Sequence, residues 1–410
     1  MSAPLFVATM PAAGHVNPLL PVLTRLVRSG TPVVAAGTEE FADALRATGA
    51  EFVGYPAGVL GSADIAAATR SGGSVAVIVK ILTATAEFAP FVAEQARSCG
   101  AAAVLHDSNA LWGRIGAALA GLPTVSFMTT ILIGSGAVKA LSVREALAET
   151  GPTLRNLPAA IRARRTLVRT FGADLVPATP MLPLRGDLTI FPVPRTLQGS
   201  DDRLDDSCMF VGPTADPGST DDLDPELAAF LDTDQPVVLV SLGTLHAAGD
   251  DFFATCVDGL GDLPIRVVIA TGRDTPPAAV AGAPSSFCWR TRVPQRAVLA
   301  RSAAFVTHGG MNSALEGIAA GVPLVVIPQQ VEQFLIGKAF ADQGAATVLR
   351  QSLAHRPVPA VALRDAVQRA VTDPALTRAA VALGGTMRTE GGADRAAELI
   401  NEFLAERVRR

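Results

Sequence analysis

Short, uninterrupted apolar runs recur along this chain, and each is followed by a segment long enough for a helix. An apolar run without alternating polar residues is typical of a strand buried on both faces. Such strands, alternating with helices, indicate parallel sheets covered by helices on both sides. The sequence therefore predicts an α/β fold. The predicted strands are LFVATM (5–10), AAVLH (102–106), TVSFM (124–128), VVLVSLG (237–243), RVVIAT (266–271), AAFVT (303–307) and LVVIP (324–328).

The chain has 410 residues, and a single hydrophobic core rarely extends beyond about 250 to 300 residues, so we expect two domains. Residues 197–230 are rich in Asp, Gly, Pro, Ser and Thr and interrupt the alternation near mid-chain. A boundary there gives an N-terminal domain of residues 1–205 and a C-terminal domain of residues 206–390. Residues 391–410 predict a helix with one apolar face, which we expect to pack back on the N-terminal domain.

The charge and the cysteine content of the chain argue against several classes of partner and site. The net charge is −4, from 34 basic and 38 acidic residues that are interspersed, so we expect neither nucleic acid nor a lipid surface as a partner. The four cysteines form no Cys-x-x-Cys pair, which argues against a disulfide framework or a zinc site and fits the cytoplasm.

The first residues resemble no signal peptide. The long uncharged run 115–138 contains Gly121 and Pro123, so we expect no membrane span.

His15 lies in the first predicted junction between a strand and a helix. Asn17 is a good N-cap and Pro18 suits the first helical position, so we expect His15 on a loop just before the helix. The positive end of a helix disfavours the protonated ring, and a neutral histidine can accept a proton as a general base. The alternative is a loop histidine that is hydrogen-bonded to the backbone.

Asp107 follows a predicted strand at the same edge of the sheet as His15, if both strands are parallel. A carboxylate there could orient His15 and stabilise its protonated form. The alternative is that Asp107 or Ser108 caps the following helix. The adjacent His106 is expected to end the strand.

The triplet His308-Gly309-Gly310 forms the corresponding junction in the C-terminal half. Glycines allow a ligand to approach the backbone closely, and the start of a helix favours phosphate, so the turn predicts a diphosphate site. Ser313 and Glu316 match a capping box. The chain has neither Gly-x-Gly-x-x-Gly nor a Walker loop, so neither a dinucleotide nor ATP is indicated. Alternatively, the glycines serve only the tight turn.

Gly14-His15-Val16-Asn17-Pro18 and the block 293–333 together resemble the bacterial antibiotic and macrolide branch of the nucleotide-sugar-dependent glycosyltransferases. The resemblance covers nearly the whole chain and is most specific in that block. It implies the GT-B fold, with two facing Rossmann-like domains, parallel sheets and an interdomain cleft. It also implies that the N-terminal domain binds the acceptor, and that His15 deprotonates the acceptor hydroxyl while Asp107 pairs with His15.

The resemblance further implies a set of donor contacts in the C-terminal domain. These are Val293 and Gln295 for the base and adjoining donor, His308, Gly309 and Gly310 for the diphosphate with Asn312 and Ser313 beside it, Glu316 for the ribose, Glu332 and Gln333 for the sugar, and Ser241 and Thr244 near the phosphates.

Two positions depart from the family pattern. Arg292 stands where relatives commonly have a tryptophan that stacks on the nucleobase, and Trp289 lies three residues earlier. A guanidinium plane can also stack on a base, so Arg292 is a candidate donor contact. Glu332 stands where many relatives have an aspartate.

The implied reaction is inverting transfer from a UDP- or TDP-sugar, which is a co-substrate, without a metal or other cofactor. The Asp232-Thr-Asp234 triplet invites a metal-dependent alternative, but it precedes a strand and so lies away from the ligand edge. Phe88, Phe127, Met128 and Ile131 are candidates to line a pocket for an apolar natural product, and core packing is their alternative role.

Two alternative hypotheses remain. One is transfer of the sugar to a membrane lipid, which would fit the basic residues Arg162, Arg164, Arg165 and Arg169. The other is a non-catalytic helper protein of the same fold. A homodimer is compatible with the sequence.

Overall fold

The computed structural model describes residues 3–132, 140–178, 182–215, 223–243 and 249–408. The chain forms two compact units. The N-terminal unit consists of Met1–Gly134, Glu149–Asp216 and Glu390–Arg410, and the C-terminal unit consists of Ser135–Ala148 and Pro217–Thr389. The N-terminal unit therefore extends past the predicted boundary at residue 205, and the chain passes between the units four times.

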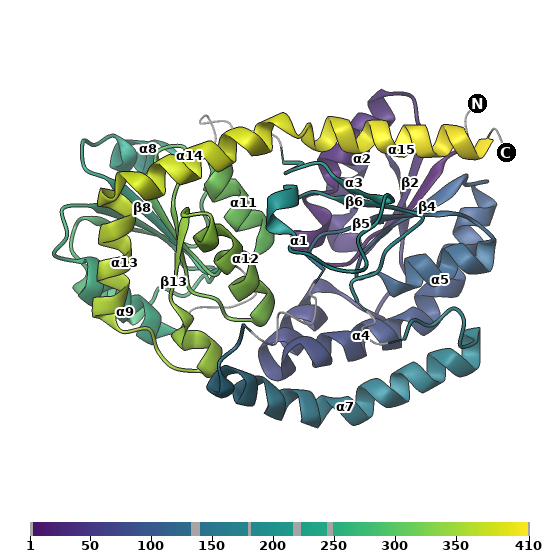
Figure 1. The fold of residues 1–410 in the computed structure, drawn as a ribbon, viewed down its shortest axis with the longest axis horizontal. Coiled ribbons are helices and arrows are strands. Elements are labelled where there is room, and N and C mark those ends of the chain that lie inside the picture. Colours follow the sequence, from purple (N-terminus) through teal and green to yellow (C-terminus); the bar gives the residue numbers. More distant parts are fainter. Residues whose placement is uncertain (1–2, 133–139, 179–181, 216–222, 244–248, 409–410) are drawn as a thin grey trace. The chain divides into compact units, whose positions relative to one another are not determined.

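The N-terminal unit contains a seven-stranded sheet in the order β3-β2-β1-β4-β5-β6-β7, and all of its paired strands are parallel (Figure 1). The order reverses between β1 and β4, and in sheets of this type ligands bind at that switch point, beyond the carboxyl ends of the strands. The strands are β1 (Leu5–Ala8), β2 (Val33–Gly37), β3 (Glu51–Gly54), β4 (Ala103–Asp107), β5 (Thr124–Phe127), β6 (Leu188–Phe191) and β7 (Cys208–Phe210).

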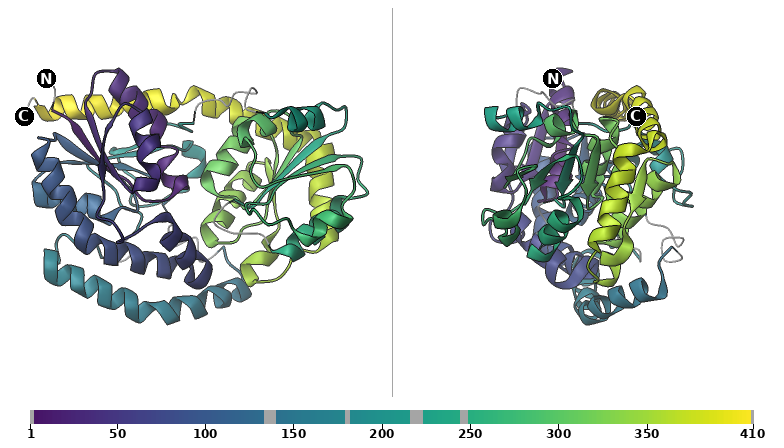
Figure 2. Two further views of the ribbon diagram at one scale, coloured as in Figure 1. Left: turned by 180° about the vertical axis from the view of Figure 1, so that it is seen from behind. Right: turned by 90° about the vertical axis from the view of Figure 1, so that its left-hand side faces the viewer.

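Helices cover both faces of this sheet (Figure 2). Successive side chains of β1 point to opposite faces, so Phe6 lies in one hydrophobic core and Leu5 in the other. The first core includes α4 and α5, and the second includes α2 and α15. The helices are α1 (Ala13–Val16), α2 (Leu20–Arg28), η1 (Glu39–Phe41), α3 (Ala42–Ala47), α4 (Ser62–Ser98), α5 (Leu111–Ala120), α7 (Val143–Phe171), η2 (Arg195–Leu197) and α15 (Gly392–Val408).

Within α4, the segment Gly73–Ser98 is long and apolar enough, by length and composition only, to cross a membrane. In the structure, apolar residues of this segment pack in the first core. Phe88 and Val92 are fully buried in the first core, and a Cβ at Gly116 of α5 would lie only 2.6 Å from a methyl carbon of Val92. α4 thus uses its apolar face to pack closely against α5.

The C-terminal unit contains a six-stranded parallel sheet in the order β10-β9-β8-β11-β12-β13. The order reverses between β8 and β11, which gives this sheet the same kind of switch point as the first. The strands are β8 (Val237–Ser241), β9 (Arg266–Ala270), β10 (Phe287–Arg290), β11 (Ala304–Thr307), β12 (Leu324–Val326) and β13 (Ala346–Val348).

The helices of this unit are α8 (Pro225–Leu231), α9 (Asp250–Leu260), η4 (Ala278–Gly282), α10 (Gln295–Leu299), α11 (Met311–Ala319), α12 (Val331–Asp342), η5 (Arg350–Ala354), α13 (Ala360–Thr372) and α14 (Pro374–Thr389). The first turn of α7 also joins this unit. Arg350 Nε donates to Glu145 Oε1 at 3.0 Å, and the guanidinium lies 4.3 Å from the centroid of the Phe334 ring.

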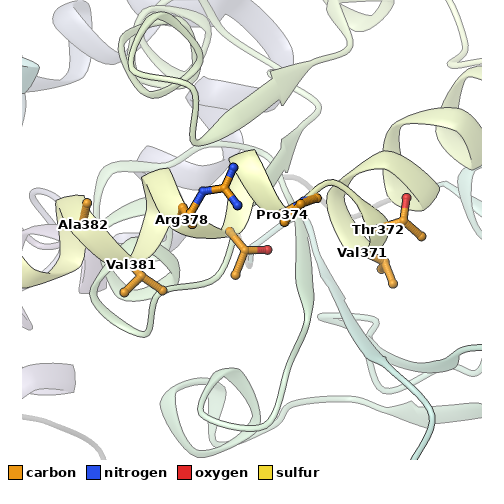
Figure 3. Close-up of a pocket in the computed structure, with 7 residues that line it drawn as sticks. Val371, Thr372, Pro374, Arg378, Val381 and Ala382 are labelled. Carbon is orange, nitrogen blue, oxygen red and sulfur yellow. The ribbon is translucent and has the colours of Figure 1, made fainter.

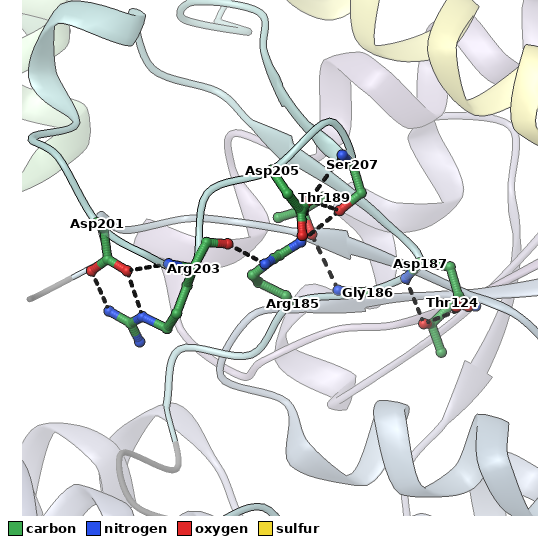
Figure 4. Close-up of polar contacts among 9 residues, drawn as sticks. All are labelled: Thr124, Arg185, Gly186, Asp187, Thr189, Asp201, Arg203, Asp205 and Ser207. Carbon is green, nitrogen blue, oxygen red and sulfur yellow. Dashed lines mark hydrogen bonds and ion pairs between the residues drawn. The ribbon is translucent and has the colours of Figure 1, made fainter.

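The amino-terminal edge of the first sheet is held by polar contacts between loops (Figure 4). The backbone N–H and the hydroxyl of Thr124 both donate to Asp187, and Arg185 donates to Asp205 and to Ser207. The Arg185 guanidinium, together with the Ser207 hydroxyl, holds the pKa of Asp205 well below its usual range. These contacts lie at the edge opposite to the carboxyl ends of the strands, so we assign them a structural role.

Candidate active site

His15 lies within the four-residue helix α1, and the prediction that it stands on a loop is wrong. Asn17 does not cap the following helix. It has helical backbone angles (φ −55°, ψ −45°) despite preceding Pro18, and it forms the C-cap of α1. α2 begins at Leu20, with Leu19 as its N-cap residue. The chain thus turns into a short helix soon after β1, and this helix carries His15 at the carboxyl edge of the sheet.

The structure brings His15 and Asp107 together at the switch point of the N-terminal sheet. His15 Nδ1 lies 2.9 Å from Asp107 Oδ2. The Thr129 hydroxyl oxygen lies 2.7 Å from the same ring nitrogen and donates to Asp107 Oδ2 at 3.1 Å. The Asp107 side chain is 2% exposed, and its other oxygen accepts from the Asn109 backbone N–H at 2.7 Å. A carboxylate held in this way orients the ring and favours the tautomer with a proton on Nδ1, which leaves Nε2 as the proton acceptor.

Thr129 was not predicted as a site residue. It comes two residues after β5, and β5 pairs with β4 so that Phe127 lies opposite Asp107. A polar residue just beyond the apolar run TVSFM was the available signal, because the carboxyl ends of parallel strands meet at one edge of a sheet.

His106 lies one residue before Asp107 on β4, and its side chain points to the opposite face of the sheet. Its ring is fully buried, and a Cβ at Gly113 of α5 would lie 2.5 Å from the His106 Cβ. Burial lowers the pKa of His106 to about 4, and its Nδ1 hydrogen-bonds to the Asp107 carbonyl at 2.9 Å. His106 is therefore a neutral core residue.

At the switch point of the C-terminal sheet, the His308-Gly309-Gly310 turn joins β11 to α11. Gly310 is the N-cap residue of α11 and has no side chain that could cap the helix. The predicted capping box of Ser313 and Glu316 is therefore wrong, because both residues lie inside the helix. Instead, the Gln295 amide donates to Glu316 Oε2 at 2.7 Å and to the Ser313 hydroxyl at 3.3 Å.

The glycines of this turn are required by close packing. Gly309 has a φ of 81°, and a Cβ there would lie 2.6 Å from Val326 Cγ1. A Cβ at Gly310 would lie 2.4 Å from His308 Nε2, and one at Gly243, just after β8, would lie 2.7 Å from His308 Cε1. Because real Cβ atoms do not approach so closely, the backbone lies directly against the His308 ring at both positions.

Three more of the predicted donor residues, Glu316, Glu332 and Gln333, lie on the two helices α11 and α12. Burial raises the pKa of Glu316, and the hydrogen bond from Gln295 offsets part of this effect. Glu332 lies in the first turn of α12. Its neighbour Gln333 is buried, and its side-chain oxygen accepts from the Gln329 backbone N–H at 2.7 Å.

The remaining donor candidates lie at or near the same edge. Ser241 ends β8 and lies opposite Thr307 in the register of the sheet. Asn312 is the second residue of α11, and Val293 precedes α10. Arg292 is exposed between β10 and α10, and Thr244 lies outside the described residues.

Comparisons with known proteins agree with this architecture. Residues 207–385 match the family model "UDP-glucoronosyl and UDP-glucosyl transferase". The chain is 30% identical to the oleandomycin glycosyltransferase of Streptomyces antibioticus over 97% of this chain and 90% of that protein. The chain belongs to this family of nucleotide-sugar-dependent glycosyltransferases.

Other proteins are similar to the glycosyltransferase over almost its whole length. The NDP-glycosyltransferase YjiC of Bacillus licheniformis is 28% identical over 97% of this chain and 96% of that protein. The solved glycotransferase of kitacinnamycin is 27% identical, with a TM-score of 0.80, over 98% of this chain and 99% of that chain. The glycosyltransferase has the GT-B fold, and the proteins similar to it include glycosyltransferases named for calicheamicin, kitacinnamycin and oleandomycin.

The acceptor candidates of the glycosyltransferase are packed inside its N-terminal unit. Phe88, Phe127 and Met128 are fully buried, and Ile131 is 6% exposed. The Phe88 ring stacks on Tyr55 with 4.5 Å between the ring centroids. Contact of these side chains with an acceptor remains a prediction.

Two further features lie apart from the strand ends that carry the site. Asp232 is the C-cap of α8 and precedes β8, and no group of three or more His, Cys, Asp or Glu side chains in the described ranges could hold a metal ion. A surface hollow lies where α13 meets α14 (Figure 3). Of the side chains lining it, only Arg378 can carry a charge, so it offers no acid–base pair.

Proposed function

We propose that this glycosyltransferase transfers the sugar of a UDP- or TDP-sugar, with inversion, to a hydroxyl group of an apolar small-molecule natural product. The observation that supports this proposal best is the hydrogen-bonded group His15, Asp107 and Thr129 at the switch point of the N-terminal sheet. The 30% identical relative is named an oleandomycin glycosyltransferase, which supports a natural product as the acceptor class.

In the proposed reaction, His15 Nε2 accepts the proton of the acceptor hydroxyl. The acceptor oxygen forms a bond to the anomeric carbon as the bond from that carbon to the diphosphate breaks, and the bonding electrons leave with the nucleoside diphosphate. Attack opposite to the leaving group inverts the anomeric centre. Asp107 stabilises the imidazolium that forms, and general-base catalysis of this kind contributes roughly 10²- to 10⁴-fold in rate.

The C-terminal sheet provides the proposed donor site. α11 has nine residues, and its amino end follows the glycine turn directly. The backbone N–H groups and the helix dipole at this end favour the negative charge that develops on the departing diphosphate, without a metal ion. The Glu316 carboxylate, positioned by Gln295, would accept hydrogen bonds from the ribose hydroxyls.

The substitution His15→Ala tests the proposed base. We expect turnover to fall at least 100-fold, because the proton acceptor is lost, while the dissociation constant for the nucleoside diphosphate stays nearly unchanged. Comparable turnover in the variant would exclude His15 as the base. The anomeric configuration of the wild-type product, measured by NMR, tests inversion separately.

Calorimetric titration with UDP and with TDP, each with and without a chelator, tests the donor site. Micromolar binding that is independent of the chelator would support a metal-free diphosphate site, and the tighter nucleotide would identify the donor. Loss of binding on adding the chelator would point to a metal ion instead. If neither nucleotide binds, the exposed Arg292 would mark a donor site that has changed, and a non-catalytic helper would explain the chain better.

A further inference from the structure

Helix α7 carries an unusual share of exposed apolar side chains. Seven large apolar side chains are exposed among the described residues, and five of them lie on α7: Val143, Leu147, Leu154, Leu157 and Ile161, with exposed fractions of 77%, 65%, 61%, 42% and 42%. Leu154, Leu157 and Ile161 are three and four residues apart, so they form one stripe along the helix. Ala160 and Leu167 are buried, so another side of α7 faces the core. The stripe is thus an additional apolar face directed to solvent.

The same part of α7 is strongly basic. Residues 150–171 contain Arg155, Arg162, Arg164, Arg165 and Arg169 and no acidic residue, although the chain as a whole carries a net charge of −4. The expectation that no lipid surface is a partner was drawn from the charge of the whole chain, and it did not take account of this local concentration of basic residues. All of these arginines are exposed except Arg164, which is half-buried and hydrogen-bonds to the Pro177 carbonyl at 3.3 Å. None of the five forms an ion pair with another residue that the structure describes. Their charges are therefore not neutralised within the described part of the fold.

The positions of the arginines show what the stripe can bind. At about 100° per residue, Arg162, Arg165 and Arg169 lie on one flank of the apolar stripe. A second copy of the chain packed across this stripe would bring several arginines close to their own counterparts, which like-charge repulsion disfavours. An anionic surface would instead attract the arginines while the leucine and isoleucine side chains enter its apolar layer. A helix with a basic flank beside an apolar stripe is typical of binding at a lipid interface.

We propose that the α7 face, formed by Leu154, Leu157, Ile161, Arg162 and Arg165, binds the surface of an anionic lipid bilayer. The helix would lie in the plane of the interface without spanning it. This surface is independent of the proposed catalytic role of His15. Its consequence is that the enzyme could meet apolar acceptors at the bilayer, where such molecules concentrate.

Flotation of the purified full-length protein with lipid vesicles tests the proposal. We expect the protein to float with vesicles of phosphatidylcholine and phosphatidylglycerol at low salt, to remain unbound with phosphatidylcholine alone, and to dissociate at high salt. Leu157→Asp/Ile161→Asp should reduce the partition coefficient at least tenfold, because it replaces apolar side chains that would enter the lipid with negative charges. Arg162→Glu/Arg165→Glu should also reduce it at least tenfold, since each basic residue contributes roughly fivefold to partitioning onto an anionic membrane.

Matched controls separate this surface from general effects of the substitutions. Val361 and Val381 are the other two exposed apolar residues, at 64% and 53%, so Val361→Asp/Val381→Asp should leave binding unchanged. Arg28 and Arg378 are exposed on other helices, and Arg28→Glu/Arg378→Glu serves as the charge control. Thermal unfolding and nucleotide binding show whether each variant is folded.

Three results would overturn the proposal. The first is no flotation with anionic vesicles at low salt. The second is flotation that neither α7 variant reduces. The third is a dimer of the wild-type protein in sedimentation velocity that Leu157→Asp/Ile161→Asp dissociates, because the stripe would then bind a second copy of the chain.

Discussion

The two sheets of the glycosyltransferase have the same kind of switch point, but they place different groups there. In the N-terminal unit, His15 after β1, Asp107 at the end of β4 and Thr129 after β5 hydrogen-bond to one another and hold the imidazole of His15 in position. In the C-terminal unit, glycines after β8 and β11 lie against the His308 ring, so the feature is a closely packed backbone turn. The same sheet topology therefore provides either a reactive side chain or a backbone site, depending on whether polar residues or glycines lie at the carboxyl ends of the strands.

The largest expected effect comes from changing the charge of the N-terminal group. Asp107→Asn removes the negative charge beside His15 Nδ1 and presents an amide that can favour the wrong ring tautomer, so we expect turnover to fall roughly 10²- to 10⁴-fold. Steady-state kinetics measures this effect. Asp187→Asn makes the same chemical change at the opposite edge of the same sheet and should leave turnover within a few-fold. Equal losses in the two variants would contradict the assignment of Asp107.

The second prediction adds one methyl group to the C-terminal turn. Gly310→Ala places a Cβ where the structure leaves 2.4 Å to His308 Nε2, so either the ring or the turn must move. We expect the affinity for the nucleoside diphosphate to fall about 30-fold, in line with a cost of about 2 kcal/mol for overpacking. Gly249→Ala is the matched control, because Gly249 has a φ of −69° and no atom within 4 Å of the added Cβ. Calorimetry that finds equal affinities in the two variants would show that the packing around His308 is not needed for binding.

The third prediction concerns the buried carboxylate. Glu316→Gln keeps the shape of the side chain but removes its charge, so we expect about tenfold weaker nucleotide binding, the typical range for hydrogen bonds to a charged group. The stability of the protein without nucleotide should change in the opposite direction, because the same substitution should stabilise the fold. Burial raises the pKa of Glu316, so the folded state holds the proton more tightly than the unfolded state does, and stability falls as the pH rises above the ordinary value of 4.5.

Glu316→Gln should therefore be more stable than the wild-type protein at neutral pH, and the difference should vanish in acid, where the wild-type carboxyl is protonated in both states. Denaturant unfolding at a series of pH values measures this difference. A variant that is less stable at every pH would show that the charged form of Glu316 supports the fold.

The smallest expected effect concerns the hydroxyl group of Thr129. Thr129→Val keeps the shape but removes the hydroxyl that contacts His15 and Asp107, while the direct contact between His15 and Asp107 remains. We therefore expect only about fivefold lower turnover, which corresponds to about 1 kcal/mol. Thr129→Ser retains the hydroxyl group and should restore most of the activity. If valine and serine behave alike, Thr129 only fills space between the strands.

The sequence predicted the fold class and the central strands because those strands are continuous apolar runs buried on both faces. Among the described residues, six strands were not predicted: β2, β3, β6, β7, β10 and β13. The residues of β3 are only partly buried or exposed, and β7 lies in the polar segment taken as the linker. β2 and β6 are fully buried but have only five and four residues, so burial alone does not make a short strand recognisable from the sequence. The pairing of His15 with Asp107 was predicted from parallel strands sharing one edge. The helix starts were predicted wrongly at Asn17 and Ser313, since good capping residues do not form caps where the backbone is already helical. The close approach of His308 to the glycines depends on the strand order, which the sequence does not specify.

The position of α15 constrains the order in which the protein can be completed during synthesis. Its side chains Ala396 and Ile400 are fully buried in the same core as Leu5 and Leu23. Residues 217–389, by contrast, include the whole sheet of the C-terminal unit in one continuous stretch. A ribosome therefore releases all the strands of the second sheet before it releases the helix that closes the core of the first. A nascent chain that stops before residue 390 would leave an apolar surface of the N-terminal unit uncovered.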